Sequence, residues 1–488
     1  MEYEAVIGLE VHAELLTQSK MFCACPVVDS TQAAPNTVVC PVCTGLPGVL
    51  PVVNQQAVEQ GIRVALALNC TVAHTSLFAR KNYFYPDLPK GYQISQYEYP
   101  LAEHGYLPIR TGAGERRIRI HRVHLEEDTG KLTHVQKNGE SYSLVDLNRA
   151  GVPLLEIVSE PDMHTVEEVR AYASELRTLL RNLGVNSGDM EKGVIRFEAN
   201  VSVRPLGSQE LGTRVEIKNL NSFRALERSS AYQIEQQIAL LERGEKVRQE
   251  TLGWDEGRGV TYSQRSKEEA HDYRYFPEPD LPPLVVDQAW VDQVAASLPE
   301  LPYARLVRFE KDYSLPEVDA RLLVEDQATA RYFEEAVAAA PGVPPRTLAN
   351  WITGELFAWM NQCGEDIQHL RVKPAMLARL LQLAGEGQIN LNTAKTVLNE
   401  MLGSGQEAAE IIAARGLQQV SDSDMIAQLV RQALEEHPQE VASYLAGKET
   451  LANWFFGQVM RAARGKGNPQ VIRAELEKQL ARLKSGLG

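Results

Sequence analysis

Roughly the first 290 residues of this chain contain several segments in which apolar and polar residues alternate strictly. Clear examples cover residues 5–15 and 194–204, and a shorter one covers 214–218. Strict alternation places the apolar side chains on one face of a β-strand, so each segment predicts a strand with one buried and one open face. Sheets that leave one face open are usually antiparallel. We therefore predict an α+β fold whose N-terminal part is built on an antiparallel sheet.

The open face of this predicted sheet carries acidic side chains where Thr, Lys and Ser are typical. Glu10 and His12 are two residues apart, so they point to the same side of one strand. Further acids that the chain could bring to the same surface are Glu126, Glu127, Glu191, Glu198 and Glu216. Gathered carboxylates repel each other, and carboxylate oxygens with an occasional imidazole suit magnesium or manganese. The alternative is that these glutamates are exposed or pair with nearby basic residues, namely Arg196, Arg214 and Lys218.

The alternation of apolar and polar residues shifts by one position within the strand expected over residues 117–125. Its apolar residues fall on even numbers up to Ile120 and on odd numbers from Val123. One extra residue in a strand produces such a slip, so the segment predicts a β-bulge, a feature that often re-aims side chains near active sites. Three successive acids, at 126–128, follow the strand.

Four cysteines near the start of the chain form a C-x-C pair and a C-x-x-C pair separated by a short loop. They are Cys23, Cys25, Cys40 and Cys43. Two such pairs can surround one tetrahedral zinc ion, and four sulfur ligands leave no position for a catalytic water. We therefore predict a structural zinc site; the alternative is reduced core thiols or a disulfide pair. The remaining Cys70 and Cys363 stand alone and are expected to be buried thiols.

A surface that binds divalent cations favours phosphoryl transfer as the chemistry of this chain. The sequence contains no Walker A motif and no kinase-type glycine loop with a partner lysine. It also lacks a nucleophile elbow and a Cys–His arrangement for glutamine hydrolysis. If the reaction consumes a nitrogen source, another polypeptide must therefore release it.

The pattern changes to a helical one from about residue 294, after a proline-rich stretch at 275–283. Helical periodicity covers 165–183 and 222–243 in the N-terminal part, and then 344–362, 374–384, 391–402, 424–436, 440–445, 449–463 and 469–484. Glycines at 403 and 405 mark a joint. We divide the chain into a catalytic domain at 1–293, a helical domain at 294–404 and a small helical tail domain at 405–488.

The charge of the chain is unevenly distributed. A net charge of −14 argues against a protein that coats nucleic acid nonspecifically. The last 28 residues, however, contain only two acids beside seven basic residues, which are Arg461, Arg464, Lys466, Arg473, Lys478, Arg482 and Lys484. This basic tail either grips a polyanion or is a solvated helix face.

Targeting and membrane signals are missing from the sequence. The N-terminus has no basic region followed by an apolar one, and no apolar stretch approaches the roughly 18 residues of a membrane span. We therefore expect a cytoplasmic protein without a membrane partner. A reducing compartment also favours a metal over disulfides for the four cysteines.

Several longer motifs resemble a known family. Besides the four cysteines they are YEAVIGLEVH at 3–12, RKNYFYPDLPKGYQISQY at 80–97, HLEED at 124–128, DLNRAGVPL at 146–154, EIKNLNSF at 216–223 and DYRYFPEPDL at 272–281. With these motifs the chain resembles the B subunits of bacterial aspartyl/glutamyl-tRNA amidotransferases, the GatB family. The resemblance covers essentially the whole chain.

This resemblance implies a fold and a reaction. The implied fold is a cradle built on an antiparallel sheet similar to glutamine synthetase, followed by a helical domain and a small helical tail that touches tRNA. The implied reaction uses ATP and magnesium to phosphorylate the side-chain carboxylate of mischarged Glu-tRNA(Gln) or Asp-tRNA(Asn), after which ammonia displaces the phosphate. Ammonia would come through a channel from the amidase (A) subunit, and the small (C) subunit would bind both of these proteins.

The resemblance also assigns site residues. The implied catalytic residues are Glu126, Glu127, Glu10, His12 and Glu216. The implied magnesium ligands are Glu10, His12, Glu126, Glu191 and Glu216. The implied cofactor-binding residues are Arg196, Lys218 and Lys81. One stretch departs from the family pattern Arg-Cys-Asp-Ala-Asn: here Glu198 replaces the aspartate and reaches one methylene further, which weakens its assignment as a ligand.

Two interpretations without catalysis compete with this one. A zinc-containing adaptor that only positions tRNA would also have the four cysteines and the basic tail, but it would not need the acidic surface. A structural protein whose acids are plain surface charge would bind no divalent cation at Glu10 and His12.

Overall fold

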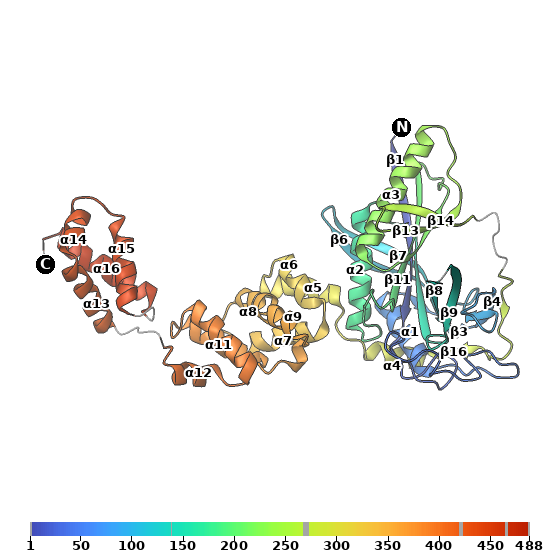
Figure 1. Ribbon diagram of the computed structural model, residues 1–488, viewed down its shortest axis with the longest axis horizontal. Coiled ribbons are helices and arrows are strands. Elements are labelled where there is room, and N and C mark those ends of the chain that lie inside the picture. Colours follow the sequence, from blue (N-terminus) through green and yellow to red (C-terminus); the bar gives the residue numbers. More distant parts are fainter. Residues whose placement is uncertain (1, 138, 267–272, 419–422, 464–466, 487–488) are drawn as a thin grey trace. The chain divides into compact units, whose positions relative to one another are not determined.

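A computed structural model describes residues 2–137, 139–266, 273–418, 423–463 and 467–486 of the chain (Figure 1). The chain separates into two compact units, Met1–Arg305 and Leu306–Gly488. Three residues used in the sequence predictions lie outside the described residues, namely Asp272, Arg464 and Lys466.

A nine-stranded sheet organises the first unit, in the order β14-β13-β12-β11-β1-β10-β7-β6-β2. Its strands are β1 (Tyr3–Glu14), β2 (Thr71–Val72), β6 (Ala102–Thr111), β7 (Gly114–Glu127), β10 (Pro153–Ser159), β11 (Ile195–Pro205), β12 (Val215–Leu220), β13 (Glu250–Asp255) and β14 (Val260–Ser266). Neighbouring strands are antiparallel except β12 and β13, which are parallel. The predicted antiparallel sheet is confirmed apart from this pair.

Helices cover one face of the sheet. They are α1 (Gln55–Ala67), α2 (Val166–Asn182) and α3 (Phe223–Glu242), and α4 (Gln288–Ala296) packs on the same core. The apolar residues of β1, such as Ile7, Leu9 and Val11, are fully buried beneath them, and burying each contributes about 1.5–3 kcal/mol. Helix α2 begins at a capping box, in which the Thr165 side chain accepts from the backbone of Glu168. The two helices predicted in this part of the chain are confirmed.

The other face of the sheet is the open one. The shorter strands of this unit are β3 (Thr75–Ser76), β4 (Ala79–Asn82), β5 (Tyr92–Ser95), the hairpin β8 (Lys131–Lys137) and β9 (Glu140–Asp146), β15 (Phe276–Pro277) and β16 (Leu284–Val285). Of these, β4, β8 and β9 lie on the side of the open face (Figure 1). Strand β5 reaches the open face directly, because Ser95 Oγ donates a hydrogen bond of 3.0 Å to Glu126 Oε2 on β7. The predicted bulge is confirmed, since the pairing of β7 with β10 skips His121.

The secondary-structure elements described in the second unit are helices, and the first of them share one hydrophobic core. They are α5 (Pro302–Tyr313, which starts in the first unit), α6 (Glu317–Val324), α7 (Gln327–Ala339), α8 (Pro345–Trp351), a π-helical turn (Ile352–Leu356), α9 (Phe357–Cys363), a 3₁₀ turn (Ile367–His369), α10 (Pro374–Gly385), α11 (Leu391–Ser404) and α12 (Ala408–Arg415). One hydrophobic core joins them, and it includes Ile411 and Ile412 of α12. This core therefore extends past the joint expected at 404. Cys363 is exposed at the end of α9, so its predicted burial is wrong, whereas Cys70 is buried as expected.

A separate small core joins the last helices, α13 (Ser423–Glu436), α14 (Pro438–Leu445), α15 (Leu451–Ala462) and α16 (Pro469–Lys484). Helix α16 begins at the predicted residue 469. Asn468 caps it by accepting from the backbone of Gln470 and Val471, and Pro469 occupies the first turn. Ile472, Leu476 and Leu480 are its buried stripe. Among the described residues, no helix is long and apolar enough to cross a bilayer.

Candidate functional site

One cluster of site residues lies on the open face, across β1, β10 and β7. His12 is paired with Glu156, and Glu156 with His124, in the register of these three strands. Residues opposite each other in antiparallel strands point to the same face, so the register alone brings His12, Glu156 and His124 together. Glu126 lies two residues after His124 on the same strand and therefore points to the same face. His12 Nε2 lies 3.6 Å from Glu126 Oε1 and 3.7 Å from Glu156 Oε2. We name His12, Glu126 and Glu156 the histidine cluster; their ligand atoms lie within 4.8 Å of one another.

Positive charge next to the histidine cluster keeps its carboxylates ionised. The buried His124 places Nε2 2.9 Å from Glu156 Oε2. Burial lowers the pKa of His124, but the charge of Glu156 and hydrogen bonds to both carboxylates raise it to about 9. Burial raises the pKa of Glu126 and of Glu156, yet His124, His12 and Lys81 outweigh it, and both pKa values lie below their usual range. Ionised carboxylates are the form that a cation requires.

A second cluster lies beside the first, across β1, β11 and β12. Glu10 is paired with Glu198, and Asn200 with Glu216. Asn200 Nδ2 donates a hydrogen bond of 2.8 Å to Glu10 Oε1, and Thr251 Oγ1 donates one of 2.9 Å to Glu216 Oε2. We name Glu10, Glu198 and Glu216 the glutamate cluster; one oxygen from each lies within 4.8 Å of the others.

Lys218 supplies positive charge next to the glutamate cluster. Its Nζ lies 2.6 Å from Glu198 Oε2 and 3.2 Å from Glu216 Oε1. Burial raises the pKa of Glu10, repulsion from Glu156, Glu198 and Glu216 raises it further, and Lys218 offsets only part of this effect. The carboxylates around Glu10 therefore disfavour its negative charge, and a divalent cation bound between them would offset this repulsion.

A cavity of about 1020 Å³ connects the two clusters. This volume is at the upper end for small-molecule sites, about 300–1,000 Å³. Its acidic lining residues are Glu10, Glu156 and Glu216, its basic ones are Lys81, Arg122, Arg214 and Lys218, and its aromatic ones include Tyr85, Tyr273 and Tyr275. Burial lowers the pKa of Lys81, but the charge of Glu126 and its neighbours raises it above the usual range. Cation-binding acids beside several basic groups suit a ligand that carries phosphates.

Two of the implied catalytic or magnesium-binding residues lie outside both clusters. Glu127 follows Glu126 on the same strand and so points to the opposite side, where it forms an ion pair with Lys90 and accepts from the backbone of Ile94 at 3.0 Å. Glu191 is exposed in a turn held by Asp189. The structure therefore does not bring Glu127 or Glu191 into either cluster.

Arg196 is engaged in an ion-pair network rather than lining the cavity. Its Nη1 lies 2.9 Å from Asp128 Oδ2 and 3.7 Å from Glu14 Oε1. Burial raises the pKa of Asp128, but Arg196 and Arg149 lower it to about 2. Burial and the charge of Asp128 raise the pKa of Glu14 to about 8. Of the three implied cofactor-binding residues, Lys81 and Lys218 are the ones that line the cavity.

Sequence reasoning missed Glu156 and His124. On β10 the neighbours of Glu156 on the open face are Leu154 and Val158, so the strand is apolar on both faces and shows no alternation. The one signal was a single carboxylate inside a short apolar run. His124 stands two residues before Glu126, and the period of a strand places the two on one face.

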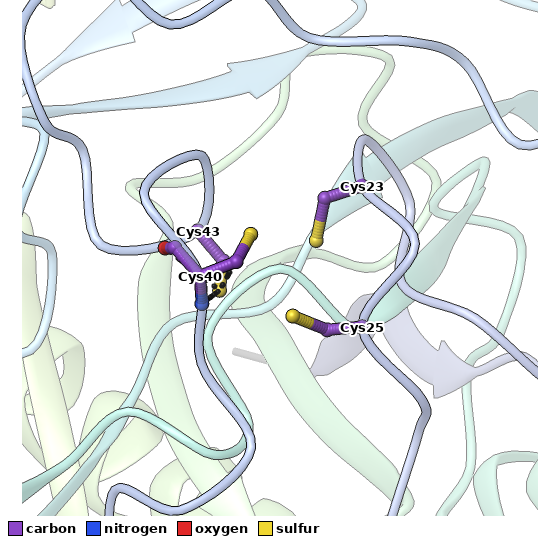
Figure 2. Close-up of side chains that lie close together, drawn as sticks. All are labelled: Cys23, Cys25, Cys40 and Cys43. Atoms are coloured by element: carbon purple, nitrogen blue, oxygen red, sulfur yellow. Dashed lines mark hydrogen bonds between the residues drawn. The ribbon is translucent and has the colours of Figure 1, made fainter.

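The four cysteines converge as predicted (Figure 2). Their sulfurs lie within 4.8 Å of one another, and the sulfurs of Cys40 and Cys43 are 3.8 Å apart. Tetrahedral zinc with Zn–S bonds of about 2.3 Å requires sulfurs about 3.8 Å apart. The donor set and its spacing therefore fit zinc, and all four cysteines are free thiols in this structure.

Comparisons with known proteins agree with these observations. Residues 5–292 match the family model for the GatB/GatE catalytic domain, and residues 331–480 match the model for the GatB domain. The chain is 52% identical to a protein of Thermodesulfovibrio yellowstonii over 97% of this chain and 98% of the relative. It is 50% identical to one of a Roseiflexus species over 99% of both chains, and 52% identical to one of Moorella thermoacetica over 98% and 100%. All three relatives are named as the B subunit of an aspartyl/glutamyl-tRNA(Asn/Gln) amidotransferase.

Proposed function

Because the chain belongs to the GatB family of tRNA-dependent amidotransferase subunits, we propose that its cavity activates the side-chain carboxylate of a mischarged aminoacyl-tRNA. The substrates are Glu-tRNA(Gln), Asp-tRNA(Asn) or both, together with ATP. A carboxylate oxygen attacks the γ-phosphorus of ATP and ADP leaves. Ammonia then attacks the acyl carbon, phosphate leaves, and the product is Gln-tRNA(Gln) or Asn-tRNA(Asn).

One observation supports this proposal most directly: acids from both the histidine cluster and the glutamate cluster line the same cavity as several basic side chains. Phosphoryl transfer needs cations beside the phosphates and positive side chains where charge develops. A protein that only positions tRNA would not need buried, ionised carboxylates in a cavity. This argues against the adaptor function.

The two clusters are the proposed magnesium sites. Their carboxylate oxygens and single imidazole are the donors that magnesium accepts. The histidine cluster would hold one ion through His12, Glu126 and Glu156, and the glutamate cluster another through Glu10, Glu198 and Glu216. Magnesium bound there would neutralise phosphate charge. Lys81 and Lys218 would contact phosphate oxygens from the cavity wall.

The remaining parts of the chain have supporting roles in this proposal. We propose that the sheet domain is a cradle similar to glutamine synthetase, that the middle helices form a second domain, and that the last four helices bind the body of tRNA. The four cysteines would hold zinc that fixes the adjoining loops. The partners would be the amidase (A) and small (C) subunits of the same complex, with ammonia passing from the amidase to this chain through a channel.

The proposal is tested with glutamate-to-glutamine variants in the reconstituted complex. Glu126→Gln and Glu156→Gln remove a charge with little change of volume. We expect each to reduce tRNA-dependent ATP cleavage by at least about 100-fold, since a cation loses a ligand, while tRNA binding persists. Glu160→Gln, which changes a partly exposed carboxylate just beyond β10, is the matched control and should behave like wild type.

Normal turnover by Glu126→Gln and Glu156→Gln would contradict the assignment of the histidine cluster. An adaptor gives a different result. It would show no ATP cleavage that depends on mischarged tRNA in the wild-type complex.

A further inference from the structure

A lysine with no exposed surface lies against the four-cysteine cluster. The Lys20 side chain is 0% exposed. Its Nζ lies 3.0 Å from the carbonyl oxygen of Val38, 3.4 Å from that of Leu147 and 3.6 Å from Cys43 Sγ. An ammonium group has three protons to donate, and each of these three atoms accepts one.

Lys20 touches both halves of the cysteine cluster. Its backbone N–H donates to the carbonyl oxygen of Cys25 at 2.9 Å, in the first pair, while its ammonium reaches Cys43 in the second pair. Its stem packs against Gly151, where an added Cβ would lie 3.5 Å from Lys20 Cδ and 3.4 Å from Cys43 Cβ. Gly151 has φ +87°, so a side chain there would also be strained. The lysine therefore sits in a closely fitted position.

The charge of the metal-loaded cluster explains why a buried ammonium is stable here. Four thiolates and one Zn²⁺ carry a net charge of −2. A buried ammonium without a negative partner costs several kcal/mol, and two neutral carbonyl oxygens do not supply that charge. The thiolate of Cys43, which accepts a hydrogen bond from Lys20, supplies that negative charge.

Resting on the proposed zinc site, we propose that Lys20 is a positioning residue. Its ammonium offsets the negative charge of the zinc-loaded cysteine cluster and so strengthens zinc binding. It does not ligate the ion. Its hydrogen bond to Leu147 also ties the cluster to the segment that leads into β10, the strand of Glu156.

The test measures zinc affinity of the full chain by competition with a chromophoric chelator. Lys20→Met removes the charge but keeps an unbranched side chain, and we expect zinc affinity to fall about 10- to 100-fold, as for other residues that contact metal ligands. Lys192→Met is the matched control: Lys192 is 46% exposed and pairs with Asp29, in the loop that follows Cys25. The zinc affinity of Lys192→Met should equal that of wild type.

Cobalt substitution distinguishes an effect of the Lys20 charge from an effect on the arrangement of the four cysteine ligands. At saturating Co²⁺, Lys20→Met should keep the thiolate-to-cobalt absorption of wild type, since all four ligands remain. Zinc affinity of Lys20→Met within twofold of wild type would overturn the inference. Loss of the four-thiolate spectrum would also overturn it, because Lys20 would then only shape the loops. Wild type that binds no zinc would instead remove the proposed zinc site itself.

Discussion

Removing Lys218 should tighten the binding of a divalent cation, although a lysine is lost from the site. Lys218 Nζ lies 2.6 Å from Glu198 Oε2 and 3.2 Å from Glu216 Oε1, so it occupies the region in which a cation would be held. In the protein without nucleotide, the ammonium and the cation compete for the same carboxylates. Lys218→Met removes this competitor and leaves the three ligands in place.

The size of the effect follows from Coulomb's law. The ligand oxygens lie within 4.8 Å of one another. At a separation of about 5 Å, an ammonium and a Mg²⁺ ion would repel each other by about 1.7 kcal/mol in a water-like dielectric. The water-like value applies because the Lys218 side chain is 36% exposed. Since about 1.4 kcal/mol is a factor of ten, cation affinity should increase roughly 10- to 20-fold.

The assay is Mn²⁺ binding to the full chain without nucleotide, measured from the paramagnetic resonance signal of free Mn²⁺. Lys192→Met, which also removes one positive charge, is the control and should bind as wild type does. Adding Glu198→Gln to Lys218→Met should abolish most of the gain, because it removes a ligand of the same cluster. Equal Mn²⁺ affinity in wild type and Lys218→Met would refute the glutamate cluster as a cation site.

Three further predictions concern other parts of the chain. Cys43→Ser should lose the single zinc ion and lower the thermal stability of the sheet domain; elemental analysis showing a full zinc content would contradict the site. Arg196→Met should destabilise the chain to denaturant by about 3–5 kcal/mol, because the buried Asp128 loses its closest charged partner; unchanged stability with a raised KM for ATP would indicate that Arg196 binds phosphate instead. Deleting 423–488, which leaves the core of α5–α12 intact, should weaken tRNA binding. The slope of log affinity against log salt concentration should become shallower by about 0.7–0.9 for each phosphate interaction that the deletion removes; an unchanged slope would indicate that the basic tail is a solvated helix face.

The faces of individual strands could be predicted from the sequence, but their pairing could not. Alternation identified the open faces of β1 and β11 and the bulge in β7, because side-chain direction is a local property. The order of strands depends on long-range packing. Strand β10 lies between β1 and β7, and its apolar residues on both faces concealed this central place.

The same limit applies to the candidate site: which residues share a strand face could be predicted, but which strands lie side by side could not. Glu10 and His12 share a face by their spacing, and the structure places them in two neighbouring clusters. Glu126 and Glu127 are adjacent on one strand, so the period of two already excludes that both point to one face. Glu156 could not be recognised locally. Its place became clear only from the register of β10 with β1 and β7.

The central claim is that the cavity transfers phosphate to the side-chain carboxylate of the aminoacyl-tRNA, and an oxygen label tests it most directly. Glu-tRNA(Gln) or Asp-tRNA(Asn) with ¹⁸O in the side-chain carboxylate is supplied to the reconstituted complex with ATP and ammonia. Phosphorylation of the carboxylate moves one labelled oxygen into the released phosphate, so we predict one ¹⁸O in phosphate for each amide formed, and neither product with Glu126→Gln. Amide formation accompanied by unlabelled phosphate would contradict the account.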